Sequence, residues 1–493
     1  MDASFAGYGY HRRATVAVDE EAVTVLLRFR VANWESIRDE QELSLVAADE
    51  HDDLATQDIP GTTLRVLPVV GVLGANASGK SNLMTAMAYA RDAVRYSHRR
   101  WDPRGGTRRV PFALDDDSAG RPSEFSFDFL QEGVRYEYGF AVDDTSVTAE
   151  WLYGWPHGRR RMLFEREGPQ EIELGPGLRR GFGNRTRMVR ESVRPNSLFV
   201  SAGVAGNHPL LTRVYDWVDR VTTAFDGNAH MRLELTLRML SGPQRDLCML
   251  LLRYADLGIT GVRSEEREIP KEAAAHFAAG FKVLHPDRPP ADPEGWRQSP
   301  EIVVAHHTPG GDVELPYGAE SSGTWTWLEL VGVAVRALVE GRVLIVDELD
   351  ARLHPNLAGQ LVRLFSEPET NPHGAQLVFN THDVTLLSRH SFGYLTRDQA
   401  WFTEKGTDGS TELIALREFK VRDDRDAVLK KYLLGAFSAI PFFDEEINDE
   451  LTRLLTNRAI AFESGTEELE EQKKPSAEKG SDEGPRSQVP RLL

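Results

Sequence analysis

The chain has 493 residues, with 58 basic and 76 acidic side chains and a formal net charge of −18. At about 150 residues per domain, this length predicts roughly three domains, and 41% hydrophobic with 27% charged residues excludes a wholly disordered chain. The best apolar stretch, 330–339, is interrupted by Arg336 and is too short to span a membrane. The single cysteine, Cys248, cannot form an internal disulfide. We therefore expect a cytoplasmic protein with no membrane contact.

The negative total argues against a protein that binds nucleic acid over its whole surface, but the charge is unevenly distributed. Residues 159–194 contain ten arginines and five acidic residues. This segment leaves open a local contact with DNA, although an ordinary exposed face is the simpler explanation. Its aromatic residues are few, so base stacking is not indicated.

In chain order, the first part of the sequence predicts strands around one glycine-bearing loop. Residues 1–22 lack sustained periodicity and are expected to form an added arm. The segment 23–32 alternates towards its end, as a strand does, and 67–73 is a nearly all-apolar run typical of a strand buried on both faces. A helix is expected over 80–96, with apolar residues on one face. The segment 124–142 alternates around a Gln-Glu-Gly turn and predicts a β-hairpin.

The second part of the chain changes character. Residues 209–285 predict mostly helix, although 233–240 also fits the alternation of a strand. Two further short apolar runs, 343–346 and 376–379, predict buried strands. After residue 462 the composition is Glu, Lys, Ser, Gly and Pro with scattered apolar residues, and we expect a disordered tail.

A phosphate-binding loop is the strongest motif in the sequence. Residues 74–81 read GANASGKS and match G-x-x-x-x-G-K-[ST] between a predicted buried strand and a predicted helix. Glycines let such a loop curl so that backbone N–H groups point at phosphate oxygens. Lys80 would reach the β and γ phosphates of ATP, and the Ser81 hydroxyl would bind Mg²⁺. The residues expected to contact nucleotide here are Gly74, Asn76, Ser78, Gly79, Lys80, Ser81 and Asn82.

An acidic pair ends a second buried strand. Asp347 and Glu348 follow the run 343–346; we expect Asp347 to hold Mg²⁺ and Glu348 to act as general base towards water. An acidic pair at the end of a strand is common, so it indicates a nucleotide site here only in combination with the phosphate loop. Lys80 and Asp347 lie 267 positions apart, which indicates a large insertion and disfavours kinases and GTPases.

Three weaker motifs accompany this pair. Ser321, Ser322 and Gly323 open a predicted helix, where a Ser-Gly loop can bind an anion or simply cap the helix. Asp350 lies in a turn just after the acidic pair, and His382 follows the last buried strand, where it could sense a γ-phosphate. Taken alone, such a histidine is more often structural.

The order of these motifs resembles the ABC-type ATPase heads of the SMC, RecF and overcoming-lysogenization-defect group. More narrowly, it is similar to bacterial AAA-type ATPases linked to abortive phage infection. The match is carried by the loop 74–81, the SSGT run at 321–324, VLIVDELD at 343–350 and THD at 381–383, with local support near 31–45 and 431–441.

This resemblance implies an α/β fold: a P-loop NTPase head of the ABC type with a β-rich subdomain and an inserted helical lobe. The expected parts are an N-terminal arm (1–22), the first half of the head with the P-loop and β subdomain (23–205), the inserted helical lobe (206–311), the second half of the head (312–445), and a C-terminal helix with a disordered tail (446–493).

In such heads, two ATP molecules with Mg²⁺ are held between two protomers. The resemblance implies that Ser321, Ser322 and Gly323 bind the partner's ATP and that Asp350 lies at the seam. Lys80, Glu348 and His382 would be catalytic. The chain departs from the family pattern at Glu35, where a basic residue is expected, so Glu35 is not assigned to nucleotide binding. Gln131, in a hairpin turn, is interpreted as structural.

Three functions follow as hypotheses. The first is an ATP-hydrolysing sensor and switch subunit of a phage-defence complex. It would form a homodimer or larger assembly through the ATP interface and act through a separate effector, a nuclease or toxin. The second is a RecF-like, ATP-dependent DNA-binding protein that uses the region from Arg159 to Arg194. The third is a scaffold that binds ATP without hydrolysing it.

Overall fold

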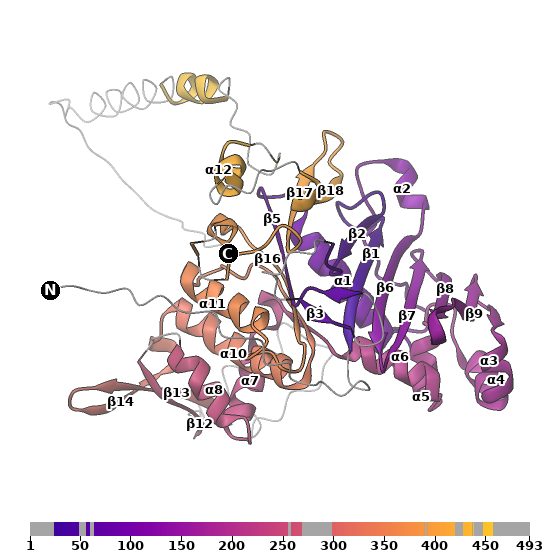
Figure 1. Cartoon of the computed structure of the whole chain (residues 1–493), viewed down its shortest axis with the longest axis horizontal. Coiled ribbons are helices and arrows are strands. Elements are labelled where there is room, and N and C mark those ends of the chain that lie inside the picture. Colours follow the sequence, from indigo (N-terminus) through magenta and orange to yellow (C-terminus); the bar gives the residue numbers. More distant parts are fainter. Residues whose placement is uncertain are drawn as a thin grey trace, which may run out of the picture. The chain divides into compact units, whose positions relative to one another are not determined.

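The computed structural model describes residues 24–48, 56–59, 64–254, 258–268, 298–388, 390–391, 393–419, 427–435, 437 and 447–456. The chain separates into two compact units, Met1–Ile440 and Pro441–Leu493. The described residues of the first unit contain two large sheets, a three-stranded sheet and a two-stranded sheet (Figure 1). In the second, residues 447–456 form a helix, as the sequence predicts. The expected arm and the tail after 462 lie outside the described residues.

The larger sheet is antiparallel and has the strand order β10-β9-β8-β7-β6-β1-β2. The predicted hairpin is confirmed as β6 and β7, which turn at Glu132 and Gly133 with positive φ angles of 50° and 72°. The strands are β1 (Val25–Ala32), β2 (Gln41–Ser44), β6 (Ser123–Gln131), β7 (Val134–Val142), β8 (Val147–Gly154), β9 (Arg161–Glu167) and β10 (Glu171–Leu174).

The second sheet has the order β11-β15-β16-β5-β17-β18, with every neighbouring pair parallel except β17 and β18. The three buried strands predicted from apolar runs are confirmed as β5, β15 and β16, in which every residue is buried. The strands are β5 (Val69–Gly74), β11 (Val221–Ala224), β15 (Val343–Val346), β16 (Gln376–Asn380), β17 (Ala400–Lys405) and β18 (Thr411–Ala415).

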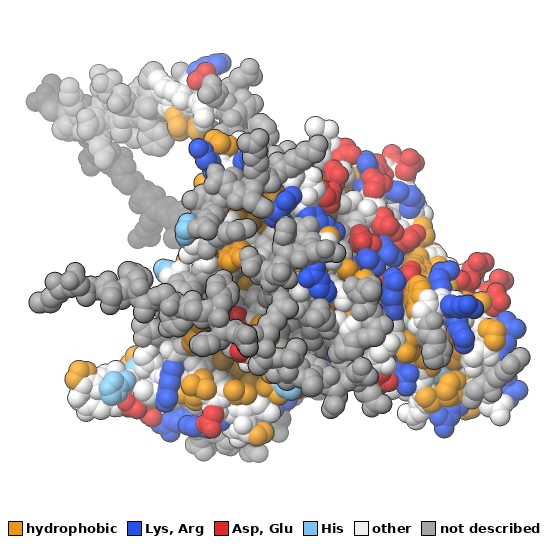
Figure 2. All heavy atoms as spheres, viewed as in Figure 1, with side chains coloured by type: hydrophobic (Ala, Val, Ile, Leu, Met, Phe, Trp, Pro, Cys, Tyr) orange, Lys and Arg blue, Asp and Glu red, His pale blue; other side chains and the backbone are white. Residues whose placement is uncertain are grey.

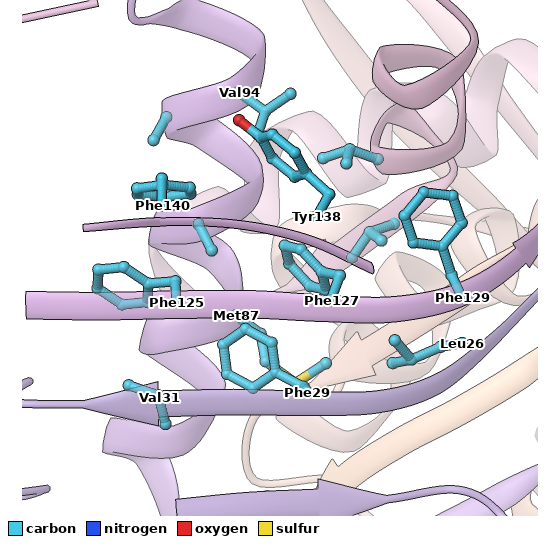
Figure 3. Packing of buried hydrophobic residues seen from close by; sticks show 14 of the residues in the cluster. Leu26, Phe29, Val31, Met87, Val94, Phe125, Phe127, Phe129, Tyr138 and Phe140 are labelled. Carbon is cyan, nitrogen blue, oxygen red and sulfur yellow. The ribbon is translucent and has the colours of Figure 1, made fainter. Parts of the chain in front are cut away.

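Helix α1 (Lys80–Tyr96) contacts strands of both sheets. Met87 and Val94 pack into an aromatic cluster on the larger sheet (Figure 3), built from Phe29 of β1, the alternate phenylalanines of β6, and Tyr138 and Phe140 of β7. These phenylalanines lie on one face because residues two apart in a strand point the same way. The helix that follows the glycine-bearing loop is therefore held by a large apolar core.

The opposite face of the parallel sheet carries a second core. It is covered by α10 (Ser322–Glu340) and α11 (Pro355–Ser366), with α7 (Ala229–Leu240) and α8 (Arg245–Tyr254) packed against α10. Trp327 of α10 is fully buried there and donates its indole N–H to Leu251 O. Burial on both faces explains why β5, β15 and β16 are continuously apolar.

A buried ion pair ties the larger sheet to the helices beside it. Glu150 of β8 and Arg166 of β9 lie opposite each other, and both side chains are fully buried. Glu150 accepts the N–H groups of Phe199 and Val200 at the start of α5 (Phe199–Ala205), and Arg166 donates to the carbonyl of Ser197 and to four others in nearby loops. These contacts satisfy both charges internally.

The sequence predicts a helical lobe over 206–311, and the structure corrects this in two places. Helices α6 (Pro209–Asp219), α7 and α8 are present, and 233–240 is helical. However, β11 joins the parallel sheet beside β15, and β12 (Ile259–Glu268) and β13 (Gln298–Thr308) form an antiparallel sheet with β14 (Gly311–Pro316). Strand β11 is too short to show a period, and every residue of β14 is exposed, so neither has the apolar run that marks a buried strand.

The remaining elements are short. They are β3 (Gln57–Asp58), β4 (Arg65–Val66), α2 (Asp116–Gly120), α3 (Pro176–Gly181), α4 (Gly183–Ser192), α12 (Ala427–Leu433) and single 3₁₀ turns at Pro156–Gly158, Asp226–Asn228, Tyr317–Ala319, Val384–Leu387 and Leu416–Glu418. Within the part of the chain that the structure describes, no helix combines the length and apolar character needed to cross a membrane.

Candidate nucleotide-binding site

The loop 74–79 connects the end of β5 to the start of α1. Gly79 adopts a φ of 102°, and a Cβ there would overlap the side chain of Thr411. A Cβ on Gly74 would likewise overlap Thr403. Asn76 is exposed at the top of the loop. Both glycines of the motif are therefore required by close packing behind the loop, which keeps its backbone curled.

Hydroxyl groups from distant strands hold the loop from behind. Ser78 Oγ lies 2.6 Å from Thr403 Oγ1 of β17, and Thr411 Oγ1 of β18 donates to Ser78 O at 2.9 Å. Thr411 Oγ1 also lies 2.7 Å from Ser36 Oγ. The Ser78 hydroxyl, which also lies 2.8 Å from Ala75 O, is thus engaged in holding the loop. Sequence reasoning did not find Thr403 or Thr411, which lie more than 320 positions further along the chain.

Lys80 is buried and bonded to its own loop. Its Nζ donates to Gly74 O at 2.9 Å and to Ala75 O at 2.8 Å. Burial lowers the pKa of Lys80 to about 8, although Asp350, Glu348 and Asp347 oppose the shift. The ammonium group is held by two carbonyl oxygens, which a phosphate could replace.

Asn380 links the loop to the acidic pair. This fully buried residue ends β16, between β15 and β5. Its Nδ2 donates to Asp347 Oδ1 at 2.6 Å and lies 3.4 Å from Ser81 Oγ, while its Oδ1 accepts the N–H of Glu348. A hydroxyl and a carboxylate are thereby brought to one place. Oxygen ligands of this kind suit Mg²⁺, so the two residues fit the metal that the sequence predicts.

Asp350 and His382 meet on the same edge. Asp350 Oδ1 accepts the Thr381 hydroxyl at 2.7 Å and the His382 N–H at 3.1 Å. The side chains of Glu348 and His382 are exposed, whereas Lys80 is buried. The acidic and histidine side chains therefore line the open side of the site, where water can reach them.

The turn at 33–37 occupies the flank of α1. With its amide oriented to suit its neighbours, Asn82 donates to Glu35 Oε2 at 2.7 Å and accepts from Ser36 Oγ at 2.6 Å. Glu35 also accepts from Thr85 at 3.1 Å, and burial, with a smaller contribution from Asp347, raises its pKa. The side chain of Asn82 is thus engaged in holding this turn.

The loop at 321–323 lies at the N-terminus of α10. Ser321 caps this helix, accepting the Thr324 N–H at 3.1 Å, and the backbone at Gly323 packs against Arg352 O, leaving no ordinary space for a Cβ. Ser321 and Ser322 are exposed. Among the described residues, no hydrogen bond joins this loop to 74–82. Hydrogen bonds therefore connect Ser81, Asp347 and Glu348 through Asn380, and Asp350 with the backbone of His382. The loop 321–323 lies beside the turn at Arg352 instead.

The parallel sheet, the glycine loop between β5 and α1, and the carboxylates at the end of β15 define an α/β P-loop NTPase fold of the ABC type. Comparison with protein families matches residues 69–388 to the family described as "AAA domain, putative AbiEii toxin, Type IV TA system". The chain belongs to this family, whose members are P-loop ATPases.

Comparisons with solved structures find similarity to SMC head domains. The SMC head bound to the C-terminal winged-helix domain of ScpA shares 13% identity, covers 79% of this chain and 97% of its own, and has a TM-score of 0.36. The SMC head domain from Thermotoga maritima shares 11%, with 79% and 98% coverage and a TM-score of 0.33. The head with extended coiled coil from Pyrococcus furiosus, bound to the C-terminal domain of ScpA, shares 13%, with 80% and 98% coverage and a TM-score of 0.35. No curated protein matches the chain.

Proposed function

We propose that this protein is an ATP-binding and ATP-hydrolysing switch subunit of a phage-defence complex of the abortive-infection type. The observation that carries ATP hydrolysis is the Asn380 bridge, which joins Ser81 in the first turn of α1 to Asp347 at the end of β15; the phage-defence role rests on the family match. This bridge between two segments almost 270 positions apart supports the proposal, because a hydroxyl and a carboxylate lie together as Mg²⁺ with ATP requires.

Each group would have a distinct task. Mg²⁺ bound with ATP neutralises negative charge on the phosphate chain. Ser81 and Asp347 would hold the metal, and Lys80 would exchange the carbonyls of its own loop for phosphate oxygens. Glu348, exposed at the edge, would orient a water molecule and accept its proton. His382 would donate a hydrogen bond close to the terminal phosphate.

We further propose that the site is completed by a second copy of the chain. Ser321, Ser322 and Gly323 are not bonded to the glycine loop of their own chain, and the two serines are exposed at a helix N-terminus, where partial positive charge attracts anions. They would contact the ATP of the partner, with Asp350 near the seam. Hydrolysis would then require dimerisation, and the ATPase would report assembly.

The first test compares Glu348→Gln with Lys80→Ala. Glu348→Gln should bind ATP but turn it over about 10²- to 10⁴-fold more slowly, because the general base is absent. It should accumulate ATP-bound dimers, which gel filtration with light scattering detects. Lys80→Ala should bind no ATP and remain monomeric. Tight ATP binding by Lys80→Ala would overturn the assignment of the loop. Unchanged turnover in Glu348→Gln would indicate an ATP-binding scaffold instead.

The effector is proposed to be a separate protein, a nuclease or a toxin. Co-expression with the product of the adjacent gene tests this: we expect the two to purify together and the ATP-locked Glu348→Gln variant to change the recovered ratio. A toxic or nuclease activity in the isolated chain would contradict the proposal of a separate effector.

A second candidate function is ATP-dependent DNA binding. The buried Arg166 and the inward-bonded Arg194 are used internally, but other arginines of 159–194 are exposed, and basic side chains gather at the right-hand edge of the molecule over α3 and α4 (Figures 1 and 2). The exposed arginines of this surface are Arg159, Arg160, Arg161, Arg179, Arg185, Arg187 and Arg190.

A charge-matched pair of triple variants tests the DNA hypothesis. Replacing Arg185, Arg187 and Arg190 on α4 by Gln should weaken binding of a DNA duplex and lower the salt slope by about one per lost phosphate contact. The control replaces three exposed arginines on α7 and α8 by Gln: Arg238, Arg245 and Arg253. Equal loss in both variants, or no binding by the native chain at low salt, would refute a specific DNA face.

A further inference from the structure

Glu320, the residue just before the loop 321–323, is held by a histidine from the small antiparallel sheet. His306 Nε2 on β13 lies 2.7 Å from Glu320 Oε1. The Glu320 side chain is only 6% exposed. Among the described residues, this is the one side-chain hydrogen bond between the sheet β12–β14 and the connection 317–323. The carboxylate is thus kept at a fixed place by a residue outside the nucleotide site.

Other contacts anchor the remainder of this connection. The ring of Tyr317 stacks on Trp325, with centroids 4.9 Å apart, and Trp325 Nε1 donates to Tyr317 O at 2.8 Å. On the other side, Gly323 packs against Arg352 O in the turn that follows the acidic pair. Glu320 is therefore the residue through which the sheet, by way of His306, contacts the segment leading into the loop, whereas the other contacts come from α10 and from the turn at Arg352.

The sheet that supplies His306 is well placed to receive an external contact. All six residues of β14 are exposed, including Val313 and Leu315, and the β13–β14 hairpin extends from the body of the unit (Figure 1). From the end of β14 the chain passes through the turn Tyr317–Ala319 directly to Glu320. A displacement of the β13–β14 hairpin would therefore move the loop both through the connecting backbone and through the hydrogen bond of His306.

The charge of Glu320 explains why its position matters. A helix N-terminus attracts anions, and a nearby carboxylate can occupy it as readily as a phosphate can. Glu320 precedes the capping residue Ser321. A carboxylate released from His306 could turn towards the first turn of α10, where it would both compete with and repel a triphosphate.

We propose that His306 and Glu320 are positioning residues that keep the N-terminus of α10 free for the ATP of a second copy, and that the β12–β14 sheet regulates dimerisation through them. This inference rests on the proposed function. Neither residue touches the nucleotide bound by its own chain, so both should affect assembly without affecting ATP binding by the monomer.

The test is a double-mutant cycle on ATP-dependent dimerisation in the full chain. The Glu348→Gln background prevents turnover. His306→Ala should raise the protein concentration needed for half-maximal dimerisation about fivefold, within the range of helix-terminus charge effects. Glu320→Gln should have little effect, and adding it to His306→Ala should restore dimerisation, because the released side chain no longer carries charge. His306→Gln, which keeps a hydrogen-bond donor, should behave as native.

ATP binding to dilute monomers checks that each variant is folded and should not change. Failure of Glu320→Gln to rescue His306→Ala, or native dimerisation by His306→Ala, would overturn the inference and leave the proposed function standing. If the Glu348→Gln background itself shows no ATP-dependent dimer, the proposed dimeric switch fails and the inference falls with it.

Discussion

Asn380→Asp is the most informative single change in the site, because it alters one atom type in a fully buried bridge. The native Nδ2 donates to Asp347 Oδ1 at 2.6 Å, and Oδ1 accepts the N–H of Glu348. The substitution keeps the acceptor and the side-chain shape. It replaces the donor by an oxygen that faces the Asp347 carboxylate, so a charge-assisted hydrogen bond becomes a contact between like charges.

The expected cost follows from these contacts. A hydrogen bond to a charged group contributes about 1.5–3 kcal/mol, and two carboxylates at this distance cannot both ionise freely, so the pKa of one is raised. We expect Asn380→Asp to lower the free energy of unfolding by about 3 kcal/mol at pH 7.5. Because the raised pKa lies above the value in the unfolded chain, stability is regained as the pH falls through it, at up to about 1.4 kcal/mol per pH unit. The recovery should occur between about pH 6 and pH 4, because 3 kcal/mol corresponds to about two pH units above the unfolded-state pKa of about 4.

Urea unfolding followed by tryptophan fluorescence measures this, since the chain has nine tryptophans. The measurement is made with EDTA, so that metal binding does not mask the repulsion. Asn380→Ala is the control: it loses the same hydrogen bonds but adds no titratable group, so its deficit should not shrink as the pH falls. Equal and pH-independent deficits in the two variants would refute the idea that Asn380 donates to Asp347.

Three further predictions concern the loop and the core. Gly79 has a φ of 102° and no room for a Cβ, so Gly79→Ala should weaken ATP binding more than tenfold in calorimetry. Gly177 faces open space, so the control Gly177→Ala should bind ATP as the native chain does. Equal binding by the two variants would contradict the packing argument. Because the pKa of Lys80 is lowered to about 8, its charge is lost above that pH and ATP affinity should fall up to about tenfold per pH unit between pH 8 and 10; a flat profile would argue against the role of its ammonium group. Arg166→Met leaves the Glu150 carboxylate buried without its cation and should cost about 3–5 kcal/mol of stability in urea unfolding, with partial recovery on adding Glu150→Gln; a cost below about 1 kcal/mol would mean that the Tyr138 hydroxyl and two backbone N–H groups satisfy Glu150 without it.

The parts of the site that lie close together along the chain can be predicted from the local sequence. A run of apolar residues ending in Gly74, followed by a glycine-bearing loop and a helix from Lys80, is encoded within fewer than 30 consecutive residues, and the structure confirms each part. The same holds for the strand before Asp347. These features depend on backbone freedom and on burial of both strand faces. Both are visible in the local sequence, as glycines in the loop and as continuous apolar runs in the strands.

The tertiary structure alone decided how the site is held together. Asn380 reaches both Ser81 and Asp347 because β16 lies between β5 and β15, and Thr403 and Thr411 support the loop because β17 pairs with β5 and β18 with β17. Strand order in a parallel sheet is set by pairing between segments far apart in the chain. The sequence around these residues therefore does not indicate which residues they contact.

The same reason explains the corrected lobe. Strand β11 is only four residues long and is a strand because β15 offers it an edge. Strands β12, β13 and β14 pair with one another, and β14 is exposed along its whole length. Periodicity records which faces are buried. Strand β14 is exposed, so its sequence shows no pattern of burial. The hydrogen bonds of β11 come from a partner strand more than 100 positions away. Both elements are therefore defined by the assembled fold and not by their local sequence.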